Sequence, residues 1–202
     1  MVEFYKSYTS KVIKLFQALD YHEIDQAKNL LVKTRNNKNI IYIFGNGGSG
    51  ASASHIAGDY VKGASYNQRE KFKFMCLNDN YAALSAISND IDYKDIFALQ
   101  LDNFVSKGDL VIGLSGSGNS ENVIRALQLG NERGATTLAF SAYKGGEIKD
   151  IASAHVYVPI SDMEIAEDLH MMIFHMIKQA IITEQKGSLS EMGDRYKRRI
   201  KD

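Results

Sequence analysis

Apolar residues recur every three or four positions through residues 1–36, which is the spacing of amphipathic helices. The pattern is interrupted near Asp20, a residue type that commonly caps the start of a helix. The spacing therefore predicts two amino-terminal helices, with a break at Asp20.

From residue 39 onward the apolar positions form short continuous runs separated by longer stretches with helical spacing. The runs cover residues 40–44, 72–77, 110–114, 136–140 and 156–159. The helical stretches cover about 49–63, 80–101, 119–133, 146–153 and 163–184. Continuously apolar strands that alternate with helices are typical of a parallel sheet covered on both faces. We expect an α/β fold, a three-layer α/β/α sandwich of about five parallel strands with extra amino-terminal helices.

Composition and charge narrow the class of protein. The 202 residues are 45% hydrophobic and carry 24 basic and 24 acidic side chains, so the charge offers no argument for a nucleic-acid partner or an anionic membrane. No apolar run approaches the roughly 18 residues of a membrane span, and no signal peptide is recognisable. The single cysteine, Cys76, cannot form an internal disulfide. We expect a cytoplasmic protein with one domain over residues 1–202 and a polar tail at 187–202.

Two glycine- and serine-rich stretches follow the first and third apolar runs. The first, at 45–50, reads GNGGSG, and the second, at 114–120, reads LSGSGNS. In a parallel α/β sheet such turns lie at the carboxyl ends of the strands, where ligands bind and helix amino termini favour anions. The hydroxyls of Ser115, Ser117 and Ser120 suit the three oxygens of a phosphate group.

The glycines of the first stretch also satisfy the G-x-G-x-x-G spacing of a dinucleotide-binding loop. That fingerprint expects an acidic residue about 20 positions further on, whereas Asp79 lies nearly thirty residues beyond Gly50. The spacing also does not explain the serine-rich second loop. We expect no nucleotide cofactor, with a nicotinamide-dependent enzyme and a pair of turns without a ligand as alternatives.

Several motifs together resemble the sugar isomerase (SIS) domain family, and within it the phosphoheptose isomerase branch. They are FGNGGSGASASH, VIGLSGSGNSENVIRA, the Ser88-Asn89-Asp90 stretch and a last helix that carries Glu167, Asp168, His170 and His175. The resemblance implies an enzyme that converts sedoheptulose 7-phosphate to D-glycero-D-manno-heptose 7-phosphate through an enediol, for surface-glycan precursors. It also implies a homotetramer with the active site between subunits. The alternative is a non-catalytic SIS module that binds a sugar phosphate or a replication-initiator protein.

The resemblance also assigns site residues. The phosphate would be bound by Ser115, Gly116, Ser117, Gly118 and Ser120. The substrate would further be contacted by Asn46, Gly47, Ser49, Asp90 and Glu167. Some members hold a zinc ion at four positions, which are here His55, Asp59, Glu167 and His175. Two imidazoles and two carboxylates suit zinc.

Aldose–ketose isomerisation needs a base for a carbon-bound proton and an acid for the oxygens. We expect Asp59 to be the general base and His175 the general acid, with His55 on the same helix face as Asp59 at i and i+4. This chain departs from the family at both helices. Asp59 replaces a glutamate, Glu167 replaces a glutamine, and Gly63 stands where a basic residue commonly follows the carboxylate by four.

Overall fold

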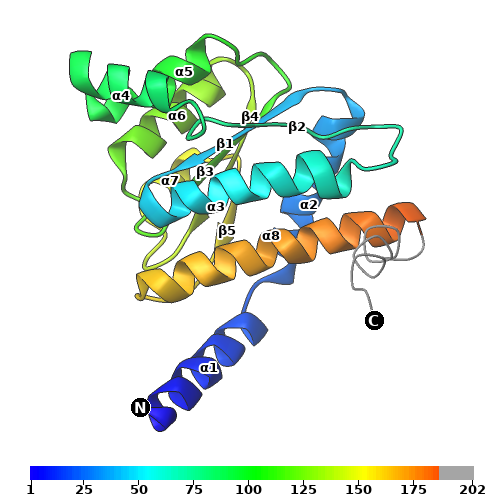
Figure 1. The fold of residues 1–202 in the computed structure, drawn as a ribbon, viewed down its shortest axis with the longest axis vertical. Helices are drawn as coiled ribbons and strands as arrows, with labels where there is room; N and C mark the ends of the chain where they lie inside the picture. Colours follow the sequence, from blue (N-terminus) through cyan, green and yellow to red (C-terminus); the bar gives the residue numbers. More distant parts are fainter. Residues whose placement is uncertain (187–202) are drawn as a thin grey trace, which may run out of the picture.

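The computed structural model describes residues 1–186, which form one parallel sheet between two layers of helices (Figure 1). The strands are β1 (Ile40–Gly45), β2 (Lys73–Cys76), β3 (Leu110–Ser115), β4 (Thr136–Ser141) and β5 (Ala154–Tyr157), in the order β2-β1-β3-β4-β5. The predicted α/β/α sandwich of five parallel strands is confirmed. The predicted polar tail at 187–202 lies outside the described residues.

Alternate residues of each central strand enter opposite layers because side chains alternate across a sheet. In β1, Ile41 and Ile43 belong to one hydrophobic core and Tyr42 and Phe44 to the other. The first core includes α2 (Tyr21–Asn36), α3 (Gly47–Gly58) and α8 (Met163–Lys186). The second includes α5 (Ala98–Asp102), α6 (Glu121–Glu132) and α7 (Ile148–Ile151). Burial on both faces explains why the strands read as unbroken apolar runs.

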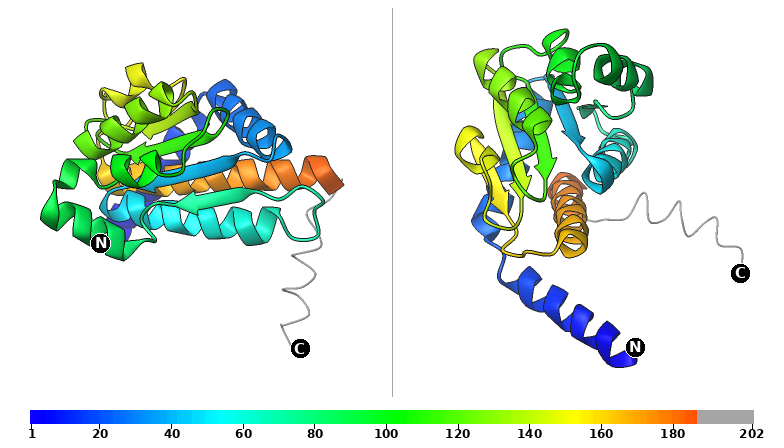
Figure 2. Two further views of the ribbon diagram at one scale, coloured as in Figure 1. Left: turned by 90° about the horizontal axis from the view of Figure 1, so that it is seen from above. Right: turned by 90° about the vertical axis from the view of Figure 1, so that its left-hand side faces the viewer.

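The two predicted amino-terminal helices are α1 (Val2–Gln17) and α2, and the Asp20 carboxylate caps the second by accepting a hydrogen bond from the His22 N–H. Helix α2 packs against the sheet, whereas none of the residues of α1 is buried. Figures 1 and 2 show α1 projecting from the body of the molecule. Among residues 1–186 no helix combines the length and the apolar character that crossing a membrane requires.

The single helix predicted at 80–101 is wrong. The chain forms α4 (Tyr81–Asp90), a 3-10 turn (Tyr93–Asp95) and α5. The backbone leaves the helical region at Ile91, with φ −124° and ψ −87°, and the Asp92 carboxylate accepts a hydrogen bond from Lys94 N–H to start the new turn. Apolar spacing continues through this break, so periodicity alone did not reveal it.

Other elements differ in extent. The helix predicted at 146–153 is the four-residue α7, and β5 begins two residues earlier than expected, which places His155 inside the strand. The helix predicted at 49–63 is α3 followed by a π-helical turn, η1 (Asp59–Ala64). Such π turns often occur at functional sites, and this one begins at the predicted base.

Candidate active site

The two glycine- and serine-rich loops lie side by side at the carboxyl edge of the sheet. They follow β1 and β3, which are neighbours, and the register pairs Gly45 with Leu114. After β1 the chain adds β2 on one side of the sheet, and after β3 it adds β4 and β5 on the other side. The boundary between β1 and β3 is therefore the topological switch point, where ligands bind in open α/β sheets. The topology therefore explains how two motifs about 70 residues apart in sequence form one pocket.

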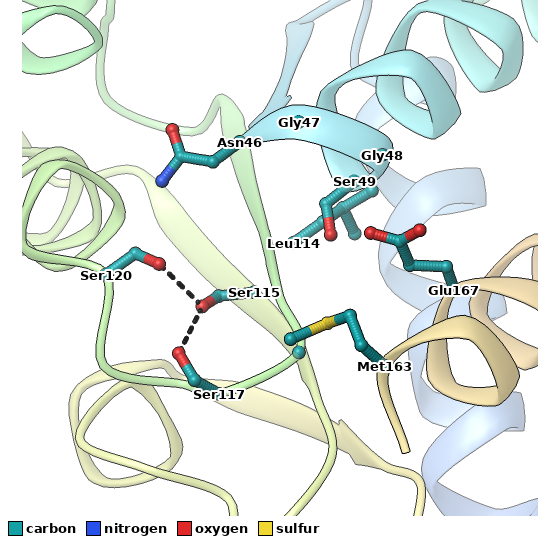
Figure 3. A pocket seen from close by; sticks show the side chains of 11 residues that line it. Asn46, Gly47, Gly48, Ser49, Leu114, Ser115, Ser117, Ser120, Met163 and Glu167 are labelled. Carbon is teal, nitrogen blue, oxygen red and sulfur yellow. Dashed lines mark hydrogen bonds between the residues drawn. The ribbon is translucent and has the colours of Figure 1, made fainter.

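The pocket between the loops has a volume of about 220 Å³. Helix α8 closes one side of it with Met163 and Glu167 (Figure 3). The other lining residues are Asn46, Gly47, Gly48, Ser49, Leu114, Ser115, Gly116, Ser117 and Ser120.

Three serine hydroxyls gather at the start of α6. Ser115 Oγ lies 3.1 Å from Ser120 Oγ and 3.5 Å from Ser117 Oγ (Figure 3). Ser120 is the N-cap residue of α6, but its side chain makes no capping hydrogen bond to that helix. A helix amino terminus presents unpaired N–H groups and positive dipole charge, so this end of the pocket favours an anion.

Glycines let other segments approach the serine loop closely. Gly118 has φ +71°, and a β-carbon there would lie 1.9 Å from the Gly145 carbonyl oxygen. A β-carbon at Gly116 would lie 2.4 Å from Met163 Sδ. Gly118 N–H donates to Ser115 Oγ at 3.1 Å. The backbone of Gly145 and Gly146 thus leaves no room for a side chain at Gly118, whereas a side chain at Gly116 would displace the flexible Met163.

The first loop receives a carboxylate from α8. A β-carbon at Gly48 would lie 2.2 Å from Glu167 Oε2, so a side chain there would displace that carboxylate from the start of α3. A carboxylate is stabilised by the positive end of a helix dipole. The same carboxylate would repel a pyrophosphate bound at this end of α3. The serine loop is therefore the better anion site of the two.

An amide pair that the sequence did not reveal joins the two loops. Asn46 Nδ2 donates to Asn122 Oδ1 and Asn122 Nδ2 donates to Asn46 Oδ1, both at 2.9 Å, and Tyr93 Oη donates to Asn46 Oδ1 at 3.0 Å. Asn122 is 2% exposed. Asn46 lines the pocket, and its side chain also fixes the position of α6 relative to the first loop.

Asp90 is not among the residues that line this pocket. It is the exposed last residue of α4, and its Oδ1 accepts a hydrogen bond from Asn89 Nδ2 at 2.6 Å. Ser88, two residues earlier, lines an adjoining pocket that also includes Asn46 and Tyr93.

The predicted acid, His175, and the predicted base, Asp59, lie close together in a second group of residues, at the contact of α3 and η1 with α8. His55 Nε2 lies 3.2 Å from His175 Nε2, and Asp59 Oδ2 lies 3.3 Å from His175 Nε2 and 3.8 Å from His55 Nε2. We call these three residues the His–Asp–His group. Partial burial lowers the pKa of His175, while the Asp59 carboxylate acts in the opposite direction. This imidazole is therefore neutral at pH 7, when it can donate one N–H and accept at the other nitrogen.

The structure brings together three of the four predicted zinc ligands. The three ligand atoms lie within 4.8 Å of one another, which is compatible with one metal ion. Glu167, eight residues before His175 on α8, is not part of this group in the described chain. Its carboxylate instead lies at Gly48, in the pocket.

Two further side chains that the sequence did not single out hold the His–Asp–His group. The fully buried Tyr60 donates from its hydroxyl to the Phe174 carbonyl oxygen at 3.2 Å, which ties the residue after Asp59 to the residue before His175. The Lys178 ammonium forms an ion pair with Asp59 Oδ2. Both contacts join segments more than 100 residues apart in sequence, so local patterns do not reveal them.

The comparisons with known proteins agree on one family. A family model described as SIS domain matches residues 4–142. The phosphoheptose isomerase of a Nitratiruptor species is 37% identical over 164 residues, which are 81% of this chain and 87% of that protein. The phosphoheptose isomerase of Aliarcobacter butzleri is 35% identical over 175 residues, which are 87% of this chain and 90% of that protein.

Solved structures have the same fold. The phosphoheptose isomerase from Neisseria gonorrhoeae has a TM-score of 0.82 and 26% identity, and the match covers 90% of this chain and 98% of that chain. A phosphoheptose isomerase from Francisella tularensis has the same TM-score at 22% identity, a level that shows the fold alone.

Proposed function

Since the chain belongs to the SIS-domain family and is a sugar-phosphate isomerase of the phosphoheptose isomerase type, we propose that it interconverts sedoheptulose 7-phosphate and D-glycero-D-manno-heptose 7-phosphate. In this proposal Asp59 is the base and His175 is the acid. The observation that carries the assignment is the pairing of a carboxylate with two imidazoles on the helices that also line the phosphate pocket. A product of this kind would supply surface-glycan synthesis.

The serine loop binds the phosphate in this proposal. Ser115, Ser117 and Ser120 offer hydroxyls at the amino terminus of α6, where a dianion gains both hydrogen bonds and helix-dipole stabilisation. The Glu167 carboxylate and Ser49 line the part of the pocket nearest α3, where they can hydrogen-bond to sugar hydroxyls.

The chemical step transfers a proton between adjacent carbons. A base takes a proton from C1 of the ketose, electrons move into a C1–C2 double bond as the C2 carbonyl oxygen gains a proton, and the enediol forms. Returning a proton to C2 while the C1 hydroxyl loses one gives the aldose. Asp59 is assigned to the carbon-bound proton, and the neutral imidazole of His175, 3.3 Å away, to the oxygen-bound protons.

The residues of the His–Asp–His group are suitable zinc ligands, but the positive charge of the neighbouring Lys178 opposes a bound dication. His55, Asp59 and His175 offer donor atoms with suitable spacing, and a bound dication would polarise the carbonyl oxygen during the reaction. The Lys178 ammonium, which contacts the same oxygen of Asp59, opposes such an ion. The mechanism that we propose therefore assigns no step to zinc.

A second copy of the chain is proposed to complete the active site. His55 and His175 have side chains 54% and 40% exposed, although proton transfer benefits from exclusion of water. Within one chain the Glu167 carboxylate also lies at Gly48 and not with the His–Asp–His group. A neighbouring chain could both cover the His–Asp–His group and bring its own pocket residues to it. A homotetramer is the arrangement that we propose.

The function is tested by following sedoheptulose 7-phosphate in D₂O by NMR, which detects both the aldose and solvent deuterium at the exchanged carbon. We expect Asp59→Asn and His175→Ala each to lower kcat by about a hundredfold or more. The control variants Asp25→Asn and His22→Ala remove the same chemical groups from α2 and should keep the wild-type rate. If the Asp59 and His175 variants fold normally and keep the full rate, the assignment of base and acid is wrong.

A further inference from the structure

Lys178 is a charged group at the His–Asp–His group that the proposed chemistry does not use. It lies three residues after His175, hence on the same side of α8, and its side chain is only 18% exposed. Its ammonium contacts Asp59 Oδ2, the same oxygen that lies nearest to both imidazoles. One carboxylate oxygen is thus the meeting point of a lysine and two histidines.

Gly63 provides the space for this lysine. A β-carbon at Gly63, in η1, would lie 3.6 Å from Lys178 Nζ and 3.8 Å from its Cδ and Cε. A β-carbon alone would be in ordinary van der Waals contact, but a longer side chain would need the volume that Lys178 fills. A basic side chain from η1 and the lysine from α8 are therefore alternative ways to place one positive charge beside Asp59.

An ammonium and a divalent cation compete for Asp59. A metal ion bound by His55, Asp59 and His175 needs a carboxylate oxygen at about 2 Å, and that oxygen already pairs with Lys178. Placing a dication a few ångströms from the ammonium adds like-charge repulsion that partial burial would strengthen. The shorter side chain of aspartate also leaves the carboxylate less reach to satisfy both partners.

We propose that Lys178 supplies the positive charge of this acid–base site: its ammonium orients the Asp59 carboxylate toward His175 and excludes a divalent metal ion from the His–Asp–His group. Lys178 is a positioning residue in this account, because it acts on substrate through Asp59. The kinetic part of the proposal depends on the proposed isomerase function, whereas the metal-binding part does not.

The first test is a calorimetric titration of the full chain with zinc, without substrate. We expect weak zinc binding to the wild-type protein and binding at least about tenfold tighter to Lys178→Met, because the repulsion is removed. The matched control is Lys28→Met, since Lys28 on α2 is also largely buried, with 15% exposure, and also pairs with carboxylates. Wild-type affinity equal to that of Lys178→Met would overturn the proposal, and that comparison stands whatever the natural substrate is.

The second test moves the charge. In the presence of a chelator, Lys178→Met should lower kcat at least about tenfold with little change in KM, because a misplaced base slows chemistry more than binding. The double variant Gly63→Lys with Lys178→Met returns an ammonium from η1 and should restore part of kcat and weaken zinc binding again. A purely structural role for Lys178 would not be rescued by that exchange, and absence of rescue in a normally folded double variant contradicts the proposal. If Lys178→Met does not fold, Lys178→Gln provides the same comparison.

Discussion

His170 carries a pH-sensitive contribution to stability. Its imidazole is 1% exposed on α8 and donates from Nε2 to the Ser141 carbonyl oxygen at 3.4 Å. Burial is the main cause that lowers its pKa to about 4, and the nearby His155 acts in the same direction. In the unfolded chain a histidine titrates near 6.5. Between pH 4 and pH 6.5 the unfolded state binds more protons at this residue than the folded state does. The contribution of the neutral imidazole to the free energy of unfolding is therefore fully present above about pH 6.5 and is lost as the pH falls toward 4.

We therefore expect the free energy of unfolding to fall by about 2 kcal/mol between pH 7 and pH 5 through this residue. Urea denaturation at the two pH values measures the change. His170→Gln keeps an N–H donor without a titrating group and should show a smaller pH dependence, while the exposed His22→Gln should behave like the wild type. An unchanged pH dependence in His170→Gln would contradict the burial argument.

At the same scale, the sequence identified residues whose roles follow from local spacing or from family motifs, and it missed those defined by contacts across the fold. Asp59 and His55 were recognised because they match a family motif in which a carboxylate follows a histidine by four residues. Lys178 and Asn122 gave no such signal, because their partners Asp59 and Asn46 are 119 and 76 residues away. Glu167 was expected among the zinc ligands on the basis of the family motif, and in this chain its carboxylate lies beside Gly48, a contact that the sequence did not reveal.

Among the elements, the serine loop depends on the turn that follows β4. Gly118 and Gly146 both have positive φ, and a β-carbon on either would lie within 2.6 Å of the other segment. Ile148 N–H also donates to the Gly118 carbonyl oxygen at 3.1 Å. The amino terminus of α7 and the serine loop therefore hold each other in position.

Gly118→Ala should destabilise the chain by at least about 1–2 kcal/mol from the left-handed backbone alone, and the clash with Gly145 should displace the loop and raise KM for the sugar phosphate. Gly108→Ala is the matched control, because Gly108 also has positive φ (+93°) but its nearest neighbour is the side chain of Asn39, far from the pocket. That control should lose stability with KM unchanged. Equal KM values for the two variants would mean that this contact does not shape the proposed phosphate site.

At this scale the sequence predicted the element types better than their ends. Strand and helix alternation is strong when both faces of a sheet are covered, and all five strands appeared where apolar runs were found. The ends depend on single hydrogen bonds, such as the one from Lys94 N–H to Asp92, and on the π turn at Asp59. Neither changes the apolar period over the window in which a helix is recognised.

At the scale of the whole molecule, the position of α1 needs an explanation, because none of its residues is buried in the hydrophobic core of the described chain. It stands away from the sandwich, contacts α8 through bonds such as Tyr8 Oη to Asp168 Oδ2 at 2.9 Å, and exposes large apolar side chains. These are Val2, Phe4, Tyr5 and Ile13. An amphipathic helix whose large apolar side chains remain exposed is expected to pack against another chain.

Replacing Phe4 and Ile13 together by serine should shift the proposed tetramer toward smaller species, as measured by sedimentation velocity. Phe104→Ser removes an aromatic side chain of similar exposure, 57% compared with 62% for Phe4, from a different surface and should leave the assembly unchanged. A wild-type chain that sediments as a monomer would instead refute the proposed assembly. The sequence predicted a need for a partner at this helix, but packing between chains cannot be deduced from one chain.

The reciprocal amide pair of Asn46 and Asn122 also determines how experiments on this enzyme can be interpreted. Neither amide carries a group that titrates. The hydrogen bonds between the two amides are therefore uncharged across the pH range in which carboxylates and imidazoles change charge, and added salt hardly screens them. Within the pH range where the fold is stable, changes in rate with acidity or ionic strength therefore report on the reacting groups and on the charge of the substrate phosphate rather than on this contact between the loops.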